Sequence, residues 1–298
     1  MKENTSKERN KLFKSSKFKK TFKNSLVHIM LGILALIWIL PIAWVVMTSF
    51  RLEKGSYSSS FIPQKFTLSN YIGLFTDTSI FNFNRWFVNT FVVAVFSCLL
   101  ATFFLVSIAF VMSRLRFKMR KTYLNLAMIL GMFPGFMSMI ALYYIFKAIG
   151  LIDGYNKLLA LILLYSGGSG ILNFYVAKGF FDTIPKALDE AAFIDGATKW
   201  KVFTKITIPL SKPIIVYTVL TSFMAPWIDF IMAKVIIGTD SKCYTVAIGL
   251  WNMLEKENIY NWFTRFAAGA VCVSIPIAIL FIFMQKYYTD GLGGAVKG

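Results

Sequence analysis

The chain has 298 residues, of which 57% are hydrophobic and only 15% are charged, with a mean hydropathy of +0.62. A soluble domain usually carries about 25% charged residues, so the composition argues against an ordinary soluble protein and favours several membrane spans. The formal net charge of +18 lies mostly between the apolar blocks, where it suits an anionic membrane surface, and we expect no nucleic-acid partner.

The first 25 residues are polar and basic, with nine lysine or arginine side chains against two glutamates. We expect residues 1–25 to form a mobile, charged tail. Residues 26–49 are apolar over about the length of a membrane span and exceed the apolar region of a typical signal peptide. No small-residue cleavage site follows, which favours a retained first transmembrane helix over a secretory leader.

Five further apolar blocks follow, and each can supply the roughly 20 residues that a spanning helix needs. They cover residues 86–112, 123–146, 157–177, 214–237 and 262–284. Helices satisfy their own backbone hydrogen bonds in lipid, so we predict an all-α membrane protein with six transmembrane helices. The last five occupy a core at 84–284, followed by a C-terminal tail at 285–298.

The distribution of lysine and arginine predicts the orientation. Most of the 32 basic residues fall in 1–25, 113–122, 178–212 and 285–298. The segment 113–122 is the clearest case, with five basic residues and no acidic one. The positive-inside rule therefore places both the N- and the C-terminus in the cytoplasm, in a multi-pass protein of the plasma membrane.

Metal and nucleotide motifs are not found in the sequence. The three cysteines form no CxxC pair and His28 has no companion, so we predict no metal site. No GxxxxGK[ST] stretch occurs, which argues against ATP binding by a P-loop in this chain. The glycine-rich stretch 166–170 lacks the lysine and favours close helix approach or a local unwinding.

The longest inner loop, 181–213, predicts two short helices that meet at a glycine. Pro185 can begin a helix, and 186–194 is rich in helix-forming residues. Gly196 then allows a turn that a larger residue would resist. A second helix is expected over 200–207, with Pro209 and Pro213 ending it before the next span.

The first of these helices has the composition of a docking surface. Ala191 and Ala192 are small enough for close approach, and Glu190 and Asp195 flank them. Such a knob suits a groove on a cytoplasmic partner. The alternative is an ordinary amphipathic helix lying on the membrane surface.

This loop resembles the coupling loop of the permeases of ATP-binding-cassette (ABC) importers. The motif of that family is Glu-Ala-Ala, three residues, Gly, nine residues, Ile, one residue, Leu and Pro. The matching residues are Glu190, Ala191, Ala192, Gly196, Ile206 and Pro209, with Ile208 in place of the usual Leu.

The resemblance implies a transporter subunit with the type I ABC importer permease fold, and not an enzyme. The helix around Glu190 would dock in a cleft of an ATPase, with Glu190 and Asp195 pairing with basic groups there. The implied partners are a second homologous permease, two cytoplasmic ATPases that bind ATP and Mg, and an extracellular solute-binding protein. No cofactor is expected in this chain.

Within the family, the chain resembles the second permease of maltose and maltodextrin importers. The similar positions are Leu40-Pro41, Asn89-Thr90 and Pro226-Trp227. The C-terminal segment is also similar, at Gly293, Gly294, Val296 and Lys297. In that family the segment reaches toward the interface between the two ATPases, whereas an isolated glycine-rich tail would be disordered.

Two polar residues in apolar blocks are candidates for the substrate pathway, namely Asn173 and Asp229. A charge at the bilayer centre costs about 2.5–3.5 kcal/mol on insertion scales, so such a residue usually faces a cavity or a partner. Asp229 could instead lie near the outer end of its helix. Sugar recognition could also lie wholly on the partner permease.

Three other functions compete with import of a maltose-type oligosaccharide. The first is import of another sugar, raffinose-like or multiple-sugar, which the motif cannot separate. The second is an ion-coupled secondary transporter, for which the sequence shows no convincing internal repeat. The third is a membrane enzyme, which the single histidine and the lack of a nucleophile elbow argue against.

Overall fold

The structure is a computed structural model that describes residues 2–56, 60–167 and 170–295. Helices dominate this part of the chain, and its only β-type pairing is an isolated bridge between Arg51 and Phe66. The predicted all-α class is therefore confirmed for the described residues.

Three long helices agree with the predicted spans. They are α1 (Lys2–Ser49), α3 (Phe83–Arg114) and α14 (Ile259–Ala295). Each contains a stretch that is long and apolar enough to cross a membrane. The apolar runs at 26–49, 86–112 and 262–284 form these helices because a helix leaves no backbone group unpaired in lipid.

Both expected tails are helical over their described residues. Helix α1 continues without a break through the basic segment 1–25 from Lys2, and α14 continues past 284 to Ala295. The structure thus makes the N-terminal segment helical, and its mobility stays a prediction. A helix that is already nucleated extends at low cost into lysine-rich sequence, because lysine is a good helix former.

The other three apolar blocks are broken. The block 123–146 forms α4 (Arg120–Gly131) and α5 (Gly135–Ala148), bent by 101°. The block 157–177 forms α6 (Asn156–Gly167) and α7 (Gly170–Thr183), and the block 214–237 forms α11 (Lys212–Ile228) and α12 (Ile231–Ile237). One continuous helix per block, as predicted, is therefore wrong.

The break between α4 and α5 follows from Pro134. Proline has no N–H to donate and disfavours helical geometry in the residue before it. Pro134 has an extended ψ of 131° and serves as the N-cap residue of α5. Within the described residues, three helices could span a membrane singly, or up to five if each bent pair is one span.

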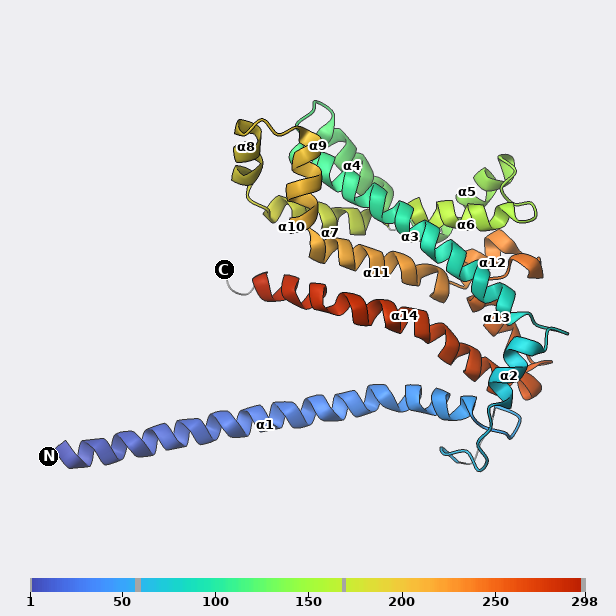
Figure 1. The fold of residues 1–298 in the computed structure, drawn as a ribbon, viewed down its shortest axis with the longest axis horizontal. Helices are drawn as coiled ribbons and strands as arrows, with labels where there is room; N and C mark the ends of the chain where they lie inside the picture. The colour runs from blue at the N-terminus through green and yellow to red at the C-terminus, as the bar shows by residue number, and fades with distance from the viewer. Residues whose placement is uncertain (1, 57–59, 168–169, 296–298) are drawn as a thin grey trace.

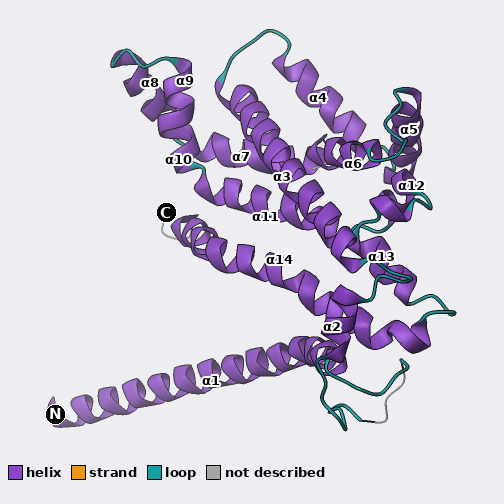
Figure 2. Ribbon diagram, turned by 45° about the vertical axis from the view of Figure 1, so that its right-hand side comes forward, coloured by secondary structure: helices purple, strands orange, loops and turns teal. Residues whose placement is uncertain are grey.

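Short helices complete the fold. They are α2 (Ser69–Thr76), α8 (Lys186–Ile194), α9 (Lys199–Val202), the π-helix η1 (Phe203–Thr207), α10 (Ile208–Leu210), the 3-10 helix η2 (Ser241–Cys243) and α13 (Val246–Met253). Helices α2 and α13 lie at one end of the molecule, and α8 to α10 lie at the other (Figures 1 and 2).

Helix α3 is the centre of the packing, because it contacts α6, α7 and α11 along its length. Phe83, Trp86 and Val93 of α3 are almost completely buried. Asn89 donates to the carbonyls of Lys242 and Tyr244, at 2.9 and 3.0 Å. The neighbouring Thr90 Oγ1 accepts from the N–H of Val246 at 2.8 Å, so the Asn89-Thr90 pair attaches the η2–α13 segment to α3.

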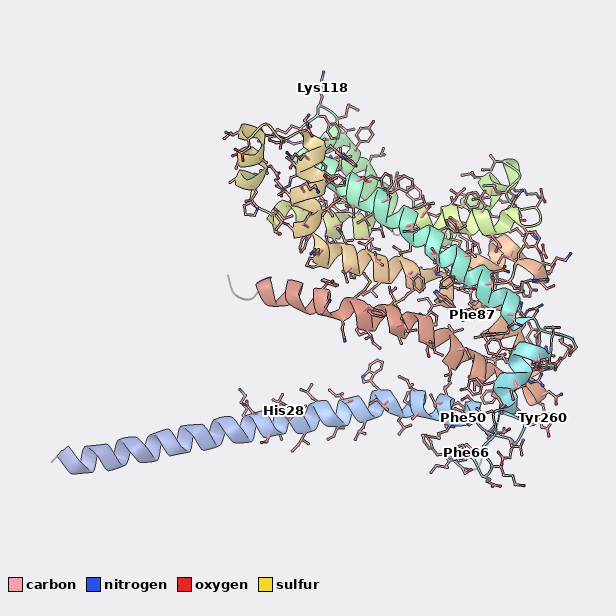
Figure 3. All side chains as sticks on the ribbon, viewed as in Figure 1. His28, Phe50, Phe66, Phe87, Lys118 and Tyr260 are labelled. Carbon is pink, nitrogen blue, oxygen red and sulfur yellow. The ribbon has the colours of Figure 1, made fainter. Side chains whose placement is uncertain are left out.

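Helix α1 stands apart from this core. Its apolar stretch Lys23–Ser49 has a central window that is 0% buried inside the protein, and His28 lies exposed on this helix (Figure 3). Only its C-terminal part packs on α14. The apolar side chains of α1 are therefore free to face lipid or another subunit.

The contact between α13 and α3 depends on a glycine. A Cβ at Gly249 would lie 2.0 Å from the Trp86 indole. We expect Gly249→Ala to lower the unfolding temperature in detergent, because overpacking costs about 1–3 kcal/mol. Gly179→Ala is the matched control, because nothing lies within 4 Å of the added methyl group. Equal unfolding temperatures for the two variants would contradict this packing.

Candidate coupling site

Helix α8 has the bounds that the sequence predicts, Lys186–Ile194. Pro185 is its N-cap residue, and Gly196 follows its last turn with a φ of +77°. The N–H of Gly196 bonds to the carbonyl of Phe193 at 3.0 Å, and that of Ala197 bonds to Ala192 at 2.9 Å. These two bonds are the Schellman pattern that ends a helix at a left-handed glycine, so the predicted turn at Gly196 is confirmed.

The second half of the loop is helical from Lys199 to Leu210, in three pieces. Thr198 caps α9 by accepting from the N–H of Lys201 at 3.2 Å. Pro209 was expected to end this segment, but it lies inside α10, and the 78° bend comes at Ser211. Because Pro209 has no N–H to continue the α-helical bonds, the widened π-turn of η1 lies directly before it.

Most of the motif residues lie on the surface of the chain. Glu190, Ala191, Asp195, Gly196 and Pro209 are exposed, whereas Ala192 and Ile206 are partly buried. Their role in coupling stays a prediction at this point.

Large apolar side chains surround the motif and are also exposed. Ile194 is 86% exposed and Trp200 is 69% exposed. Exposed apolar groups gathered on a projecting loop are typical of a surface that another protein covers.

A buried ion pair anchors α8 to the end of α3. Arg114 Nε lies 3.4 Å from Asp189 Oδ2, and the two side chains are 4% and 11% exposed. Arg114 also donates from Nη2 to the carbonyl of Ile184 at 2.9 Å. Asp189 lies in the first turn of α8, where a negative charge is favoured by the helix dipole.

A second carboxylate strengthens the same junction. Asp182, at the end of α7, accepts from Ser113 Oγ and from Lys178 Nζ, both at 2.6 Å. Burial acts to raise the pKa of Asp182, but the hydrogen bonds from Lys178 and Ser113 outweigh it and hold the pKa below its ordinary value. Asp182 is therefore ionised at neutral pH.

The residues of this junction are absent from the predicted site. The signal that could have found them is charge complementarity: the basic segment 113–122 contains no acid, while Asp182 and Asp189 flank Pro185. Sequence spacing alone does not show which arginine meets which carboxylate, because Arg114 and Asp189 belong to helices far apart in the chain.

The two predicted pathway residues lie on different elements. Asp229 is the C-cap residue of α11, where it accepts from Tyr165 Oη at 2.7 Å and from the N–H of Met232 at 3.2 Å. It therefore marks a helix break and does not lie within a continuous helix as predicted. Asn173 is half-buried on α7.

The C-terminal candidates lie at the end of α14. Gly293 and Gly294 belong to its last turn, whereas Val296 and Lys297 lie outside the described residues.

Residues 105–292 match the family described as binding-protein-dependent transport system inner membrane component. The chain belongs to this family. The matched region begins in α3 and ends in α14, so it contains the whole of the loop described above. The protein is a membrane permease subunit of an ABC importer and not an enzyme, because ATP hydrolysis in such importers is carried by a separate subunit.

Two relatives within this family are similar to the chain over most of its length. It is 36% identical over 272 residues to the galactooligosaccharides transport system permease protein GanQ of Bacillus subtilis, covering 91% of this chain and 94% of that protein. It is 34% identical over 286 residues to the maltose/maltodextrin transport system permease protein MalG of Vibrio vulnificus, covering 91% and 95%. The resemblance to maltose-type permeases is thereby confirmed.

The fold is shared with a bacterial ABC transporter involved in the import of the acidic polysaccharide alginate. The TM-score is 0.73, and the match covers 88% of this chain and 95% of the other. The sequence identity is 23%, so this likeness concerns the fold alone.

The junction between α3 and α8 can be tested by removing one charge. Asp189→Ala leaves the buried Arg114 without its partner, which costs about 3–5 kcal/mol for such pairs. We expect a lower unfolding temperature in detergent and faster proteolysis of 184–199. Adding Arg114→Met should recover part of the loss, because no unpaired buried charge remains.

Asp195→Ala is the control for this variant, because Asp195 is an exposed carboxylate of the same loop. It should stay within about 0.5 kcal/mol of the wild type. If Asp195→Ala and Asp189→Ala behave alike, the ion pair does not anchor α8.

Proposed function

We propose that the protein carries an oligosaccharide through the membrane as one of two permease subunits of an ATP-driven importer, with a maltodextrin as its substrate. A galactooligosaccharide is the second candidate, because GanQ is 36% identical and MalG 34% identical over similar shares of the chain. Both substrates are neutral chains of hexoses, so the two candidates make similar demands on a pathway.

The proposed topology has six passes with both termini in the cytoplasm. Helices α1, α3 and α14 each make one pass, and the pairs α4–α5, α6–α7 and α11–α12 make the other three as broken helices. The support comes from the placement of charge. The start of α1 and helix α9 are basic, and they lie at the same end of the molecule as α8 and the end of α14 (Figure 1), as the positive-inside rule requires of a cytoplasmic end.

The proposed coupling mechanism depends on the exposure of α8. Ile194 and Ala191 would enter a cleft on an ATPase subunit, with Glu190 and Asp195 pairing with basic groups at its rim. Because the ion pair Arg114–Asp189 ties α8 to the end of α3, closure of two ATPases on ATP and Mg would move α3 together with α8. Such rigid-body motion is the usual form of switching between two packed states.

The remaining partners follow from the family and from the uncovered surfaces. The family is binding-protein-dependent, which supports an extracellular solute-binding protein at the end formed by α2 and α13. A second homologous permease would complete the pathway against surfaces that this chain leaves open. The C-terminal residues Gly293, Gly294, Val296 and Lys297 are proposed to reach the ATPase interface.

The proposed pathway includes Asp229 and Asn173. Asp229 accepts from the N–H of Met232 in the first turn of α12 and from Tyr165, so a polar pair lies at a helix break between apolar segments. Broken helices with polar groups at the break are common at substrate sites of transporters. Carboxylate, amide and phenol groups also suit the hydroxyl groups of a sugar.

The docking role of α8 predicts a specific loss of partner binding. Ile194→Asp should reduce co-purification of the ATPase at least tenfold and abolish uptake. The unfolding temperature of the permease should not change, because Ile194 is 86% exposed and its loss removes little packing within the chain. The measurement is pull-down of the ATPase with tagged permease from membranes.

Ile62→Asp is the matched control, because Ile62 is 63% exposed in the loop at the opposite end of the molecule. It should retain the ATPase at the wild-type level. Normal ATPase binding by Ile194→Asp would refute docking through α8.

The substrate proposal predicts which sugar enters cells. In a strain that lacks this gene, the intact gene should restore uptake of labelled maltotriose. Asp229→Asn should lower that uptake while membrane abundance and ATPase co-purification stay unchanged. Uptake of a labelled galactooligosaccharide in place of maltotriose would favour the second candidate. Uptake of neither sugar would contradict both substrate candidates and would indicate an importer for another solute.

A further inference from the structure

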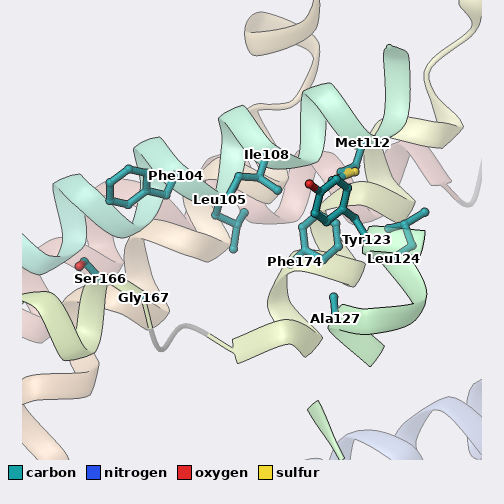
Figure 4. Close-up of a pocket in the computed structure, with 10 residues that line it drawn as sticks. All are labelled: Phe104, Leu105, Ile108, Met112, Tyr123, Leu124, Ala127, Ser166, Gly167 and Phe174. Atoms are coloured by element: carbon teal, nitrogen blue, oxygen red, sulfur yellow. The ribbon is translucent and has the colours of Figure 1, made fainter. Parts of the chain in front are cut away.

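An apolar groove of about 400 Å³ runs between α3, α4 and α7 (Figure 4). From α3, Phe104, Ile108 and Met112 line it, and from α4, Leu124 and Ala127 do so. Phe104 and Met112 are eight residues apart, so the α3 wall is about 12 Å long at 1.5 Å per residue. That length is most of the roughly 15 Å depth of hydrocarbon in one leaflet of a bilayer.

A basic cavity of about 480 Å³ adjoins the groove at its end near the coupling loop. Its lining contains Arg116, Lys118, Arg120 and Lys121 and no acidic residue. Leu124 lines both spaces, so the apolar groove and the basic cavity lie next to each other. Lys118 lies at the tip of the loop before α4 and points away from the helices (Figure 3).

The start of α4 adds to the positive charge of this cavity. This 12-residue helix begins with Arg120 and Lys121, has no acidic residue in its first turn and has no side-chain cap at Met119. Free N–H groups and the helix dipole already favour an anion there. Cations at this position are unfavourable unless an anion balances them. The buried Nε of Arg120 also has no hydrogen-bond partner among the described residues.

We propose that the groove and the basic cavity together bind one anionic phospholipid of the cytoplasmic leaflet. The phosphate contacts Arg116, Arg120 and Lys121, with Lys118 at the rim of the cavity, and an acyl chain lies along the groove. An acidic peptide or free phosphate would satisfy the basic cavity but would leave the adjoining groove empty. Basic pockets between membrane helices on the cytoplasmic side are suited to anionic headgroups.

The position of this site connects it to the coupling helix. Arg116 and Arg120 also line a cavity of about 280 Å³, and its other wall is formed by α8 with Lys186, the carboxylates of Asp189 and Glu190, and Phe193. A phosphate held by these arginines would fix the loop between α3 and α4 beside α8. The bound lipid therefore acts as a structural part of the coupling region. This proposal rests on the proposed function in one respect, namely that this end of the molecule faces the cytoplasm. It does not depend on which sugar is transported.

The test is lipid binding by the full-length protein purified with its partner subunits. Native mass spectrometry would count phosphatidylglycerol and phosphatidylcholine molecules retained from vesicles that contain equal amounts of both. We expect one phosphatidylglycerol to be retained in preference to phosphatidylcholine. Replacing Arg116, Lys118, Arg120 and Lys121 together by glutamine should reduce this retention at least tenfold.

Two further variants separate the two parts of the site. Ile108→Trp fills the groove without changing any charge, and it should also lower retention of phosphatidylglycerol. The matched control replaces four exposed lysines of the coupling loop by glutamine, namely Lys199, Lys201, Lys205 and Lys212. This control should retain the lipid. Unfolding temperatures would show that each variant is folded.

Several outcomes would overturn the proposal. Equal retention of both lipids would indicate an apolar surface without headgroup recognition. Displacement of the lipid by inorganic phosphate at millimolar concentration, with no effect of Ile108→Trp, would indicate a phosphate site. If the assembled importer retains no lipid and the second permease covers the groove, the groove is a subunit interface. None of these readouts depends on sugar uptake, so failure here is distinguishable from failure of the proposed function.

Discussion

The buried ion pair between Arg114 and Asp189 joins the central helix α3 to α8, the proposed coupling helix. On one side lies α3, around which α6, α7 and α11 pack. On the other lies α8, which projects from the fold and exposes Ile194. A projecting helix can transmit force only if its base is rigid, and two charged groups with little access to water provide such a base. The neighbouring Asp182, at the end of α7, accepts from Ser113 of α3 and from Lys178, so α7 is also attached to the end of α3.

The broken helices reflect a different constraint, the need to satisfy every backbone group in lipid. Each break exposes N–H and carbonyl groups that a continuous helix would pair. At Asp229 the side chain supplies the missing partner by accepting from Met232, and the other carboxylate oxygen accepts from Tyr165. A charged residue is thus retained among apolar helices because it caps one of them.

The surfaces of α1 and α4 that remain uncovered in the described part of the chain are largely apolar. The apolar side chains of α1 contact little of the protein, and none of the residues of α4 is buried. In a membrane such surfaces meet lipid or another subunit. The groove beside α4 ends in a cluster of cations, which distinguishes it from the purely apolar surface of α1.

The sequence by itself determined the elements whose signals are local. The apolar runs of α1, α3 and α14 appear in composition, and Pro185 and Gly196 delimit α8 because proline favours a first turn and glycine tolerates a positive φ. Hydropathy could not show the breaks near Pro134 and Asp229, since an average over 20 residues does not register where one hydrogen bond is lost. Only the tertiary structure decided that Arg114 meets Asp189 and that Arg116 and Arg120 lie beside both the groove and α8. Such contacts depend on how separate helices pack, and no local pattern in the chain encodes the partner of a buried charge.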